Sequence, residues 1–172
     1  ENGSSGSFIF KLSDGVSLAT AELMQKGLQG TFGADHLIGY DQNDKLDGYG
    51  GDDVLLAGKG NDILNGGEGI DILTGGEGDD TYIFNQGDSQ RQAQTSIVAG
   101  NPVSYTYESL DDTDGKNVIS LGANISQSSL SITHNRNAAD VILNYSDNDN
   151  LIIKNSKDYE ILLSNGSKTS VS

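Results

Sequence analysis

The sequence predicts an all-β fold, a parallel β-roll, on three observations. Residues 30–83 divide into six consecutive nine-residue repeats with no change in spacing. Glycine occurs mainly in the first four positions of a repeat, aspartate in the sixth and an apolar residue or tyrosine in the eighth. Glycine permits sharp turns, and one apolar residue between polar neighbours suits a very short, half-buried strand. We therefore expect each repeat to form one turn followed by one strand.

The two recurring side chains keep their positions in all six repeats, which we number 1 to 6 from residues 30–38 to residues 75–83. The aspartates are Asp35, Asp44, Asp53, Asp62, Asp71 and Asp80. The eighth-position residues are Leu37, Leu46, Leu55, Leu64, Leu73 and Tyr82. If two repeats complete one circuit of a flattened coil, aspartates of alternate repeats stack on the same side. We call the row at Asp35, Asp53 and Asp71 the first edge, and the row at Asp44, Asp62 and Asp80 the second edge.

Carboxylates stacked in this way require a positive counter-charge. Neighbouring parallel strands lie about 4.8 Å apart, where two like charges repel by roughly 3.5 kcal/mol at an effective dielectric constant of about 20. Calcium offsets this repulsion well, because it accepts many oxygen ligands in flexible geometry. Magnesium demands a tighter octahedral geometry. Zinc prefers His or Cys, and the chain has two histidines and no cysteine. We expect about three to five Ca²⁺ ions.

The repeats follow the pattern G-G-x-G-x-D-x-U-x, and they resemble the repeats-in-toxin (RTX) family of haemolysin-type calcium-binding proteins. The resemblance implies that each ion lies between two turns of the same edge. One turn gives the Asp carboxylate and the carbonyls of positions two and four, and the next gives the carbonyls of positions one and three. Glutamates would therefore bind through their backbone oxygens. The implied turn ligands are Gly33, Gly48, Gly50, Gly51, Gly58, Gly60, Gly66, Gly67, Glu68, Gly69, Gly75, Gly76, Glu77 and Gly78.

Several positions depart from this pattern. Thr31 and Tyr40 replace second-position glycines, Gln42 replaces an inner glycine of repeat 2, and Ala57 replaces the first glycine of repeat 4. We therefore expect the ions to concentrate in repeats 3–6, and repeats 1 and 2 to bind weakly or not at all.

The residues before the repeats, 1–29, are interpreted as a linker and a cap. Residues 1–7 are rich in Gly and Ser, and the alternation over residues 8–12 followed by Asp14-Gly15 predicts a hairpin with residues 16–18. Residues 20–26 predict a short helix that ends at Gly27. This segment resembles the one that often precedes such repeats in the family, and we expect it to cover the open apolar end of the coil. An unrelated small hairpin is the alternative.

The residues after the repeats divide into a loop and a β region. The predicted roll comprises residues 30–88. A loop insertion follows at 89–116, in which we expect Ser89–Ser96 to be exposed and Val103–Tyr107 to form an edge strand. Residues 117–172 are predicted to form a C-terminal β capping region. Five strands are predicted there, at Asn117–Leu121, Leu130–His134, Val141–Tyr145, Leu151–Lys154 and Tyr159–Leu163. Residues 147–150 predict a hairpin turn. The last residues, 165–172, resemble a type I secretion signal, with a plain disordered tail as the alternative.

Charge and composition limit the function further. The net charge is −15 and the pI about 4.1, which disfavours nucleic acid and anionic membrane as partners. Residues 30–88 carry thirteen Asp and Glu against two Lys, so without a counter-ion this stretch should stay disordered. The chain has no cysteine, and no transmembrane segment or signal peptide is recognisable. The family resemblance implies a secreted bacterial protein, extracellular or on the surface of a Gram-negative cell, exported by the type I secretion machinery.

Other candidate sites have plainer interpretations. Asp112-Thr113-Asp114-Gly115 matches part of an EF-hand loop, but leucines stand where the first and twelfth ligands belong, so an Asx-type turn is favoured. His36 and His134 lack a second histidine at metal spacing and are expected at the surface. The three tyrosines at 105, 107 and 145 would suit a sugar-binding face, although strand packing is favoured. No catalytic motif is present, so we predict no enzyme activity in this chain.

Three functions remain open. The first is a calcium-binding module that folds on Ca²⁺ outside the cell and supports the secretion, folding and stability of a larger toxin, adhesin or exoenzyme. The second is a polysaccharide-binding or adhesin module on the same roll, with polysaccharide or a host surface as partner. The third is a structural spacer that binds only calcium.

Overall fold

The computed structural model describes residues 9–11, 17–19, 27–88, 108–112, 114–134, 140–146, 149–154 and 159–171. The strands of the repeat region are β3 (Leu28–Gln29), β4 (His36–Ile38), β5 (Lys45–Asp47), β6 (Val54–Lys59), β7 (Ile63–Asn65), β8 (Ile72–Glu77) and β9 (Thr81–Phe84). The strands after it are β10 (Glu108–Asp111), β11 (Val118–Leu121), β12 (Ser131–His134), β13 (Val141–Asn144), β14 (Asn150–Lys154), β15 (Tyr159–Leu163) and β16 (Lys168–Val171). Within these ranges the one helical element is the 3-10 turn at Gln127–Ser129, and no helix is long and apolar enough to cross a membrane.

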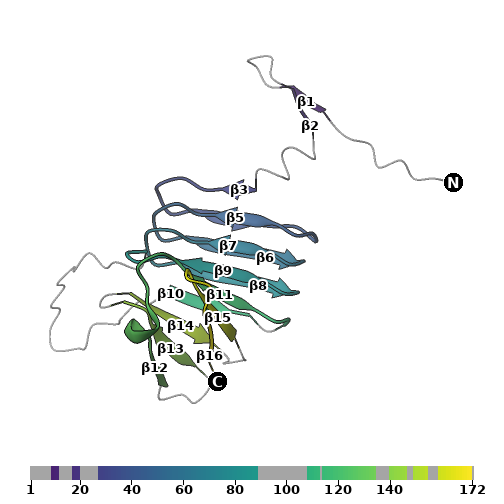
Figure 1. Cartoon of the computed structure of the whole chain (residues 1–172). Coiled ribbons are helices and arrows are strands. Elements are labelled where there is room, and N and C mark those ends of the chain that lie inside the picture. The colour runs from purple at the N-terminus through teal and green to yellow at the C-terminus, as the bar shows by residue number, and fades with distance from the viewer. Residues whose placement is uncertain are drawn as a thin grey trace, which may run out of the picture.

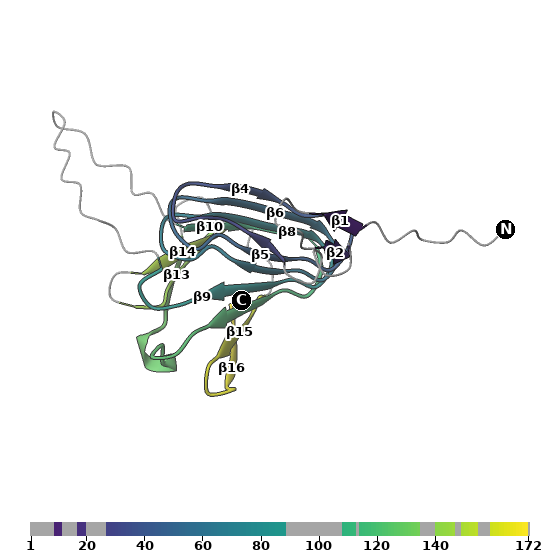
Figure 2. The same cartoon turned by 90° about the horizontal axis from the view of Figure 1, so that it is seen from above.

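The repeats wind into a flattened coil with one sheet on each side (Figures 1 and 2). Successive repeats place their strands alternately in the two sheets, so β4, β6 and β8 are neighbours in one and β3, β5, β7 and β9 in the other. Neighbouring strands are parallel, and partners lie two repeats apart, with Leu37 opposite Leu55 and Leu55 opposite Leu73. The predicted all-β fold and parallel β-roll are confirmed.

The eighth-position side chains form the centre of the coil. From repeat 2 onward they are fully buried, whereas Leu37 of repeat 1 is only partly covered. Seventh-position residues point outward, and Ile63 and Ile72 are 39% and 45% exposed. Each buried leucine contributes roughly 1.5–3 kcal/mol relative to an exposed one. The alternation that the sequence shows at every repeat therefore separates a narrow core from solvent.

The winding continues beyond the repeats. β10 pairs in parallel with β8 and β11 with β9, with Leu110 opposite Leu73 and Ile119 opposite Tyr82. These partners lie 37 residues apart, instead of the 18 within the repeats. β14 then pairs in parallel with β10, and β15 with β11. The coil therefore has further circuits that lack the nonapeptide pattern.

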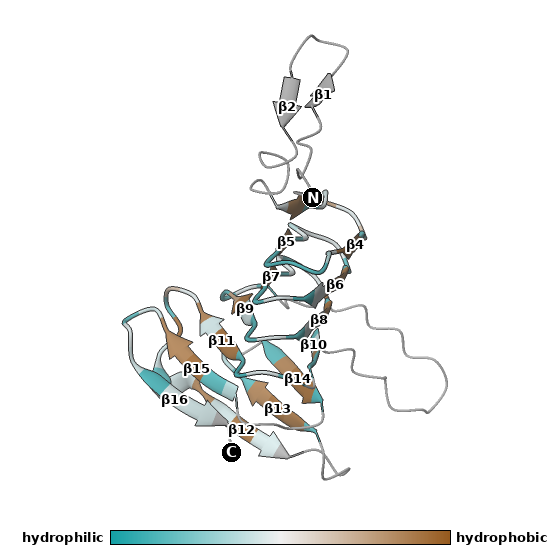
Figure 3. Cartoon of the chain, turned by 90° about the vertical axis from the view of Figure 1, so that its right-hand side faces the viewer, coloured by the Kyte–Doolittle hydropathy of each residue, from teal (hydrophilic) through white to brown (hydrophobic). Residues whose placement is uncertain are grey.

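Antiparallel strands flank these last circuits, where β12 pairs with β13, β13 with β14 and β16 with β15. Figure 3 shows that β13, β14 and β15 are mainly apolar, in contrast to the hydrophilic turns of the roll. The five strands predicted after residue 116 are all confirmed, each end within one residue. Residues 147 and 148 of the predicted turn lie outside the described residues, while the strands before and after them, β13 and β14, pair antiparallel.

Two strands lie where the sequence predicted none. β10 lies inside the predicted loop 89–116, and β16 lies inside residues 165–172, which were interpreted as a secretion signal or a disordered tail. Each contains a single apolar residue, Leu110 and Val171. They are strands because a neighbouring strand offers backbone partners, which local patterns do not encode. The division at residues 29, 88 and 116 and a signal in the tail stay predictions.

At the N-terminus, β1 (Ile9–Lys11) pairs antiparallel with β2 (Ser17–Ala19). The predicted hairpin is therefore confirmed. That it covers the end of the coil stays a prediction. The helix predicted at residues 20–26, the exposed loop at 89–96 and the edge strand at 103–107 lie outside the described residues.

Candidate metal centre

The repeat aspartates stack along the two edges of the coil. On the first edge the backbone N–H of Asp35 donates to Oδ1 of Asp53 at 2.7 Å, and that of Asp53 donates to Oδ1 of Asp71 at 2.9 Å. The second edge repeats the arrangement at 2.7 and 2.8 Å. One carboxylate oxygen per aspartate, from repeat 3 onward, thus holds consecutive circuits in register.

The other oxygen, Oδ2, divides the aspartates into two groups. In repeat 1, Oδ2 of Asp35 accepts bonds from the backbone N–H (2.6 Å) and the hydroxyl (2.8 Å) of Thr31. In repeat 2, Oδ2 of Asp44 accepts the N–H of Tyr40 at 2.6 Å. In repeats 3–6, Oδ2 has no hydrogen-bond partner although each side chain is at most 1% exposed. These four residues are Asp53, Asp62, Asp71 and Asp80.

The backbone at the second position follows the same division. In repeats 3–6 this residue has positive φ, namely Tyr49 (72°), Gly58 (116°), Gly67 (98°) and Gly76 (113°). Thr31 and Tyr40, the second residues of repeats 1 and 2, are not among the described residues with positive φ. Their N–H groups reach the aspartate of their own turn. Repeats 1 and 2, whose second residues lack positive φ, are therefore those whose carboxylates are satisfied within the turn. Repeat 3 also has a tyrosine at this position, but Tyr49 adopts positive φ and Oδ2 of Asp53 has no partner.

The first-position glycines leave the space that Oδ2 occupies. A Cβ atom placed on Gly66 or Gly75 would lie 2.1 Å from Oδ2 of the aspartate in the same repeat, a distance that no real Cβ adopts. Glycine avoids this overlap in repeats 5 and 6, whereas repeat 4 has Ala57 at the same position, so the steric requirement applies to Gly66 and Gly75 individually.

Burial raises the pKa of all four aspartates that lack a partner for Oδ2. The pKa of Asp71 and of Asp80 rises to about 7, and those of Asp53 and Asp62 rise in the same direction. Loss of hydration is the main cause of the higher pKa, and the negative charge of neighbouring carboxylates raises the pKa further. The hydrogen bond from the backbone N–H of the preceding aspartate on the same edge acts in the opposite direction. An ionised carboxylate in this setting requires a cation.

These residues fit calcium. Among the described residues, no three His, Asp or Glu side chains converge on one point, so a cation here would take most of its ligands from backbone carbonyls. Such oxygen-rich, mainly neutral ligand sets suit Ca²⁺, whereas zinc sites are built from His and Cys. A buried carboxylate oxygen without a donor, repeated at four successive turns, is the feature that indicates the ion.

The predicted carbonyl ligands lie in the turns between stacked repeats. The carbonyl of Glu68 accepts the N–H of Gly51 at 2.8 Å, and that of Glu77 accepts the N–H of Gly60 at 2.8 Å. Both glutamate side chains are exposed, and Glu77 pairs with Lys59 at 3.1 Å on the surface. Their backbones therefore lie between the turns, while their carboxylates do not. Coordination by these carbonyls stays a prediction.

A second ladder, which the sequence analysis missed, runs along the fifth positions. The N–H of Asn61 donates to Oδ1 of Asn43, the N–H of Asp79 to Oδ1 of Asn61, and the N–H of Lys116 to Oδ1 of Asp79, at 2.8–3.1 Å. Asp52 accepts the N–H of residue 70 in the same way on the first edge. The recurrence of Asn or Asp one residue before the sixth-position aspartate was the available signal.

The first edge ends in a group of buried acids that the sequence analysis also missed. Glu108 follows Asp71 by 37 residues, the interval that separates paired positions of β8 and β10. It is 1% exposed and accepts a hydrogen bond from the hydroxyl of Tyr145 at 3.0 Å. Burial raises its pKa to about 9, reinforced by Asp71, Asp88 and Asp149. Asp149 is 1% exposed and its Oδ1 has no partner.

Asn117 continues the second edge. Its Oδ1 accepts the N–H of Asp80 at 2.8 Å, the role that an aspartate has in the repeats. The preceding residues form the favoured Asx turn, because the N–H of Asp114 donates to Oδ1 of Asp112 at 3.1 Å. The turn 112–117 is therefore a degenerate repeat turn and not half of an EF-hand.

The remaining candidates are two histidines and three tyrosines. His36 is exposed, and the side chain of His134 lies outside the described part of the chain. Tyr145 is fully buried, which agrees with the favoured packing role and not with the alternative of a sugar-binding face. Tyr105 and Tyr107 lie outside the described ranges.

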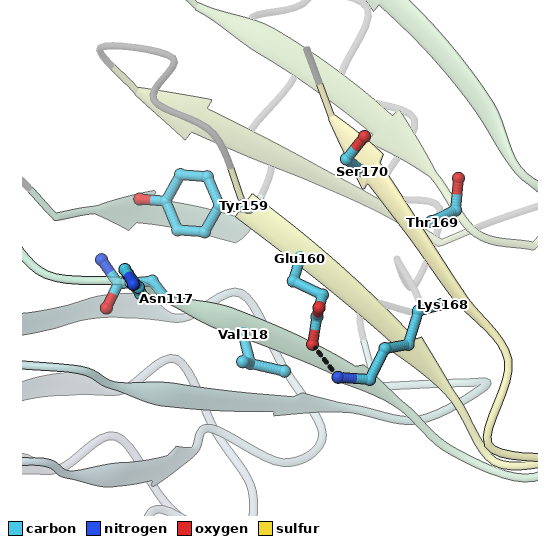
Figure 4. Close-up of a pocket in the computed structure, with 8 residues that line it drawn as sticks. Asn117, Val118, Tyr159, Glu160, Lys168, Thr169 and Ser170 are labelled. Carbon is cyan, nitrogen blue, oxygen red and sulfur yellow. Dashed lines mark hydrogen bonds and ion pairs between the residues drawn. The ribbon is translucent and has the colours of Figure 1, made fainter.

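A cleft of about 540 Å³ lies along β11, β15 and β16 (Figure 4). It contains Lys116 and Lys168, and Lys168 pairs with Glu160 at 2.6 Å. It adjoins the end of the second edge, because its lining residue Asn117 accepts the N–H of Asp80 at 2.8 Å.

Comparison with known proteins agrees with this geometry. The family model of the RTX calcium-binding nonapeptide repeat matches residues 29–64 and 56–90. The solution structure of the AlgE6R2 subunit of the Azotobacter vinelandii mannuronan C5-epimerase is similar at 27% identity and a TM-score of 0.54, over 76% of this chain and 84% of that one. The AlgE6R3 subunit of the same epimerase matches at 26% identity and 0.49, over 73% and 72%. No curated protein sequence matches significantly. Residues 29–90 therefore contain RTX calcium-binding nonapeptide repeats.

Proposed function

We propose that the chain is a calcium-triggered folding module of a larger secreted bacterial protein. The observation that supports this most is the set of four buried Oδ2 atoms without partners, on Asp53, Asp62, Asp71 and Asp80. Each is costly to ionise without a cation. With one ion between stacked turns at each, four Ca²⁺ ions would bind to the folded coil.

The need for calcium at these carboxylates also supports a function outside the cell. Inside a cell, where free calcium is low, the acidic repeats would stay unfolded and could pass through a type I secretion channel. Outside, calcium would bind the ladder and wind the coil, because ligands from different turns come together only in the folded chain. The folded module would then stabilise or position the parent protein.

Far-ultraviolet circular dichroism of the whole chain tests this proposal. The chain stripped of metal with EDTA should show a largely disordered spectrum, and excess Ca²⁺ should produce a β spectrum. Mg²⁺ at the same concentration is the control, and it should have a much smaller effect. An unchanged spectrum on adding calcium would contradict the proposal.

A second candidate is the binding of an anionic polysaccharide in the cleft at β16. Two observations favour it: the cleft contains Lys116 and Lys168 on a strongly acidic chain, and the similar AlgE6R2 structure belongs to an epimerase of mannuronan. Titration of the calcium-saturated chain with polymannuronate tests it. Lys116→Gln and Lys168→Gln should weaken binding, whereas Lys59→Gln, a lysine of the repeats, should not. Equal binding by all variants, or none by the wild type, would exclude the cleft.

A further inference from the structure

The turn at residues 112–117 stacks directly on the turn of repeat 6. Lys116 N–H donates to Asp79 Oδ1 at 2.8 Å, and Asp80 N–H donates to Asn117 Oδ1 at 2.8 Å, each pair 37 residues apart. The same interval places Asp112 at the position of Gly75, the first residue of repeat 6. In the turns that stack on repeats 3 and 4, this position is glycine. Here it has a carboxylate.

That carboxylate lies beside the one of Asp80. Asp112 is 1% exposed; its Oδ1 accepts the N–H of Asp114 at 3.1 Å, and its Oδ2 accepts the hydroxyl of Tyr82 at 2.5 Å. Unlike the backbone N–H that Oδ2 of Asp44 accepts, this hydroxyl can rotate and leave Oδ2 to a cation. The same hydroxyl accepts the N–H of Gly75 at 2.8 Å. A Cβ atom on Gly75 would lie 2.1 Å from Asp80 Oδ2 and 2.4 Å from the Tyr82 hydroxyl, so these two oxygens lie close together. Two buried carboxylates and a phenol therefore share one small volume.

Two polar atoms in this volume have no partner. Oδ2 of Asp80 has none, and neither has the hydroxyl of Tyr159, although both side chains are 1% exposed. Asp112 and Asp80 are among the charges that act on the Tyr159 hydroxyl. In Figure 4 that hydroxyl points away from the Lys168–Glu160 pair. The ion pairs Lys59–Glu77 and Lys168–Glu160 include neither Asp80 nor Asp112, so within the described ranges no lysine pairs with these two aspartates.

We propose that Asp80 and Asp112 bind one calcium ion together, at a site with two carboxylates where the other repeat sites have one. This inference rests on the proposed calcium-dependent folding. Calcium affinity rises with the number of charged ligands. The site between repeat 6 and the turn 112–117 is therefore the tightest of the ladder and fills first.

Calorimetric calcium titration of the whole chain tests this assignment. Asp112→Asn keeps the size of the side chain and removes one charge, and Asp114→Asn is the matched control, because its carboxylate is exposed in the same turn. We expect Asp112→Asn to weaken the tightest calcium-binding step by roughly tenfold or more. Asp114→Asn should leave that step close to wild type. Equal weakening by both variants, or no change in Asp112→Asn, would overturn the assignment.

Terbium luminescence gives a second readout that does not require the Asp112 variant to fold. Tb³⁺ takes calcium sites, and a tyrosine in contact with its ligands sensitises its emission. The first equivalent of Tb³⁺ added to the wild type should give the largest increase in emission, and Tyr82→Phe should remove most of that increase. If each equivalent of Tb³⁺ raised the emission by the same amount, the assignment would be overturned.

If calcium folds the wild type while these tests fail, the two-carboxylate site is wrong and the folding function stands. If calcium does not fold the wild type, the function itself is wrong.

Discussion

Acid should stabilise the metal-free coil, and calcium should reverse this dependence on pH. Burial raises the pKa of Asp71 and of Asp80 from 3.8 to about 7, and that of Glu108 from 4.5 to about 9. Between about pH 4 and pH 7 the folded chain therefore binds more protons than the unfolded chain. Stability then falls as pH rises. Metal-free stability should be fully present near pH 4 and decrease through pH 7 and beyond.

The contribution of one carboxylate can be isolated. For Asp71, the change in pKa from 3.8 to about 7 corresponds to on the order of 4 kcal/mol, an upper limit because solvent screening reduces it. Asp71→Asn removes this ionisation. In EDTA at pH 7 the variant should therefore be more stable than the wild type, by on the order of 2 kcal/mol. Near pH 4 the difference should vanish, and in excess calcium at pH 7 its sign should reverse.

Circular dichroism gives the folded fraction at each pH, because the metal-free wild type is expected to be largely unfolded at pH 7 and to regain β structure as pH falls toward about 4. Wild type and Asp71→Asn are compared across the pH range, once in metal-stripped buffer and once with excess calcium. A metal-free chain that gains stability as pH rises from about 4 to 7 would refute the reasoning. So would an Asp71→Asn variant that is less stable than the wild type in EDTA at pH 7.

Three further predictions follow from the two groups of aspartates and from the steric role of glycine. Asp62→Asn should remove about one bound calcium ion in calorimetry, whereas Asp44→Asn, whose Oδ2 already accepts a backbone N–H, should leave the number unchanged. Gly75→Ala should destabilise the calcium-loaded coil by roughly 2 kcal/mol or more in urea unfolding, because its Cβ would collide with Asp80 Oδ2. Gly33→Ala, where the added atom would meet only Thr31 Oγ1 at 3.9 Å, should be nearly neutral. The calcium-loaded chain should also show the slowest hydrogen exchange at the N–H groups that bridge repeats 3–6, with faster exchange in repeats 1 and 2.

The roll could be predicted from the sequence because one nine-residue period specifies both its chemistry and its geometry. An aspartate and an apolar residue at fixed positions place the carboxylates on the edges and the leucines in the core, as Asp53 and Leu55 do. Thr31 and Tyr40 replace glycine at the second position, and we therefore predicted that repeats 1 and 2 bind calcium weakly. Tyr49 replaces glycine in the same way but adopts positive φ, so the replacement alone does not decide the conformation. What the sequence did not show was the mechanism: the N–H groups of Thr31 and Tyr40 satisfy the carboxylates that calcium would otherwise need to reach.

The later circuits could not be predicted in the same way. The chain between β9 and β10 adds 19 residues to one circuit, so the interval between stacked positions changes from 18 to 37. At the new interval the aspartates are replaced by Glu108 and Asn117, and a glycine is replaced by Asp112. Each substitution keeps an oxygen at the required place but breaks the sequence pattern. Only the strand pairing shows that these residues belong to the same ladders.

Apolar burial and metal binding stabilise different parts of the same coil. Of the buried apolar residues, all but five lie at or beyond Tyr82, and none precedes Leu46. The C-terminal circuits therefore have a core that can persist without metal, whereas repeats 3–6 bury few apolar atoms and many carboxylates. The site between Asp80 and Asp112 lies at the junction of these two parts. An ion bound there would join the last repeat to the apolar core of the C-terminal circuits, so we expect winding to proceed from the C-terminal end.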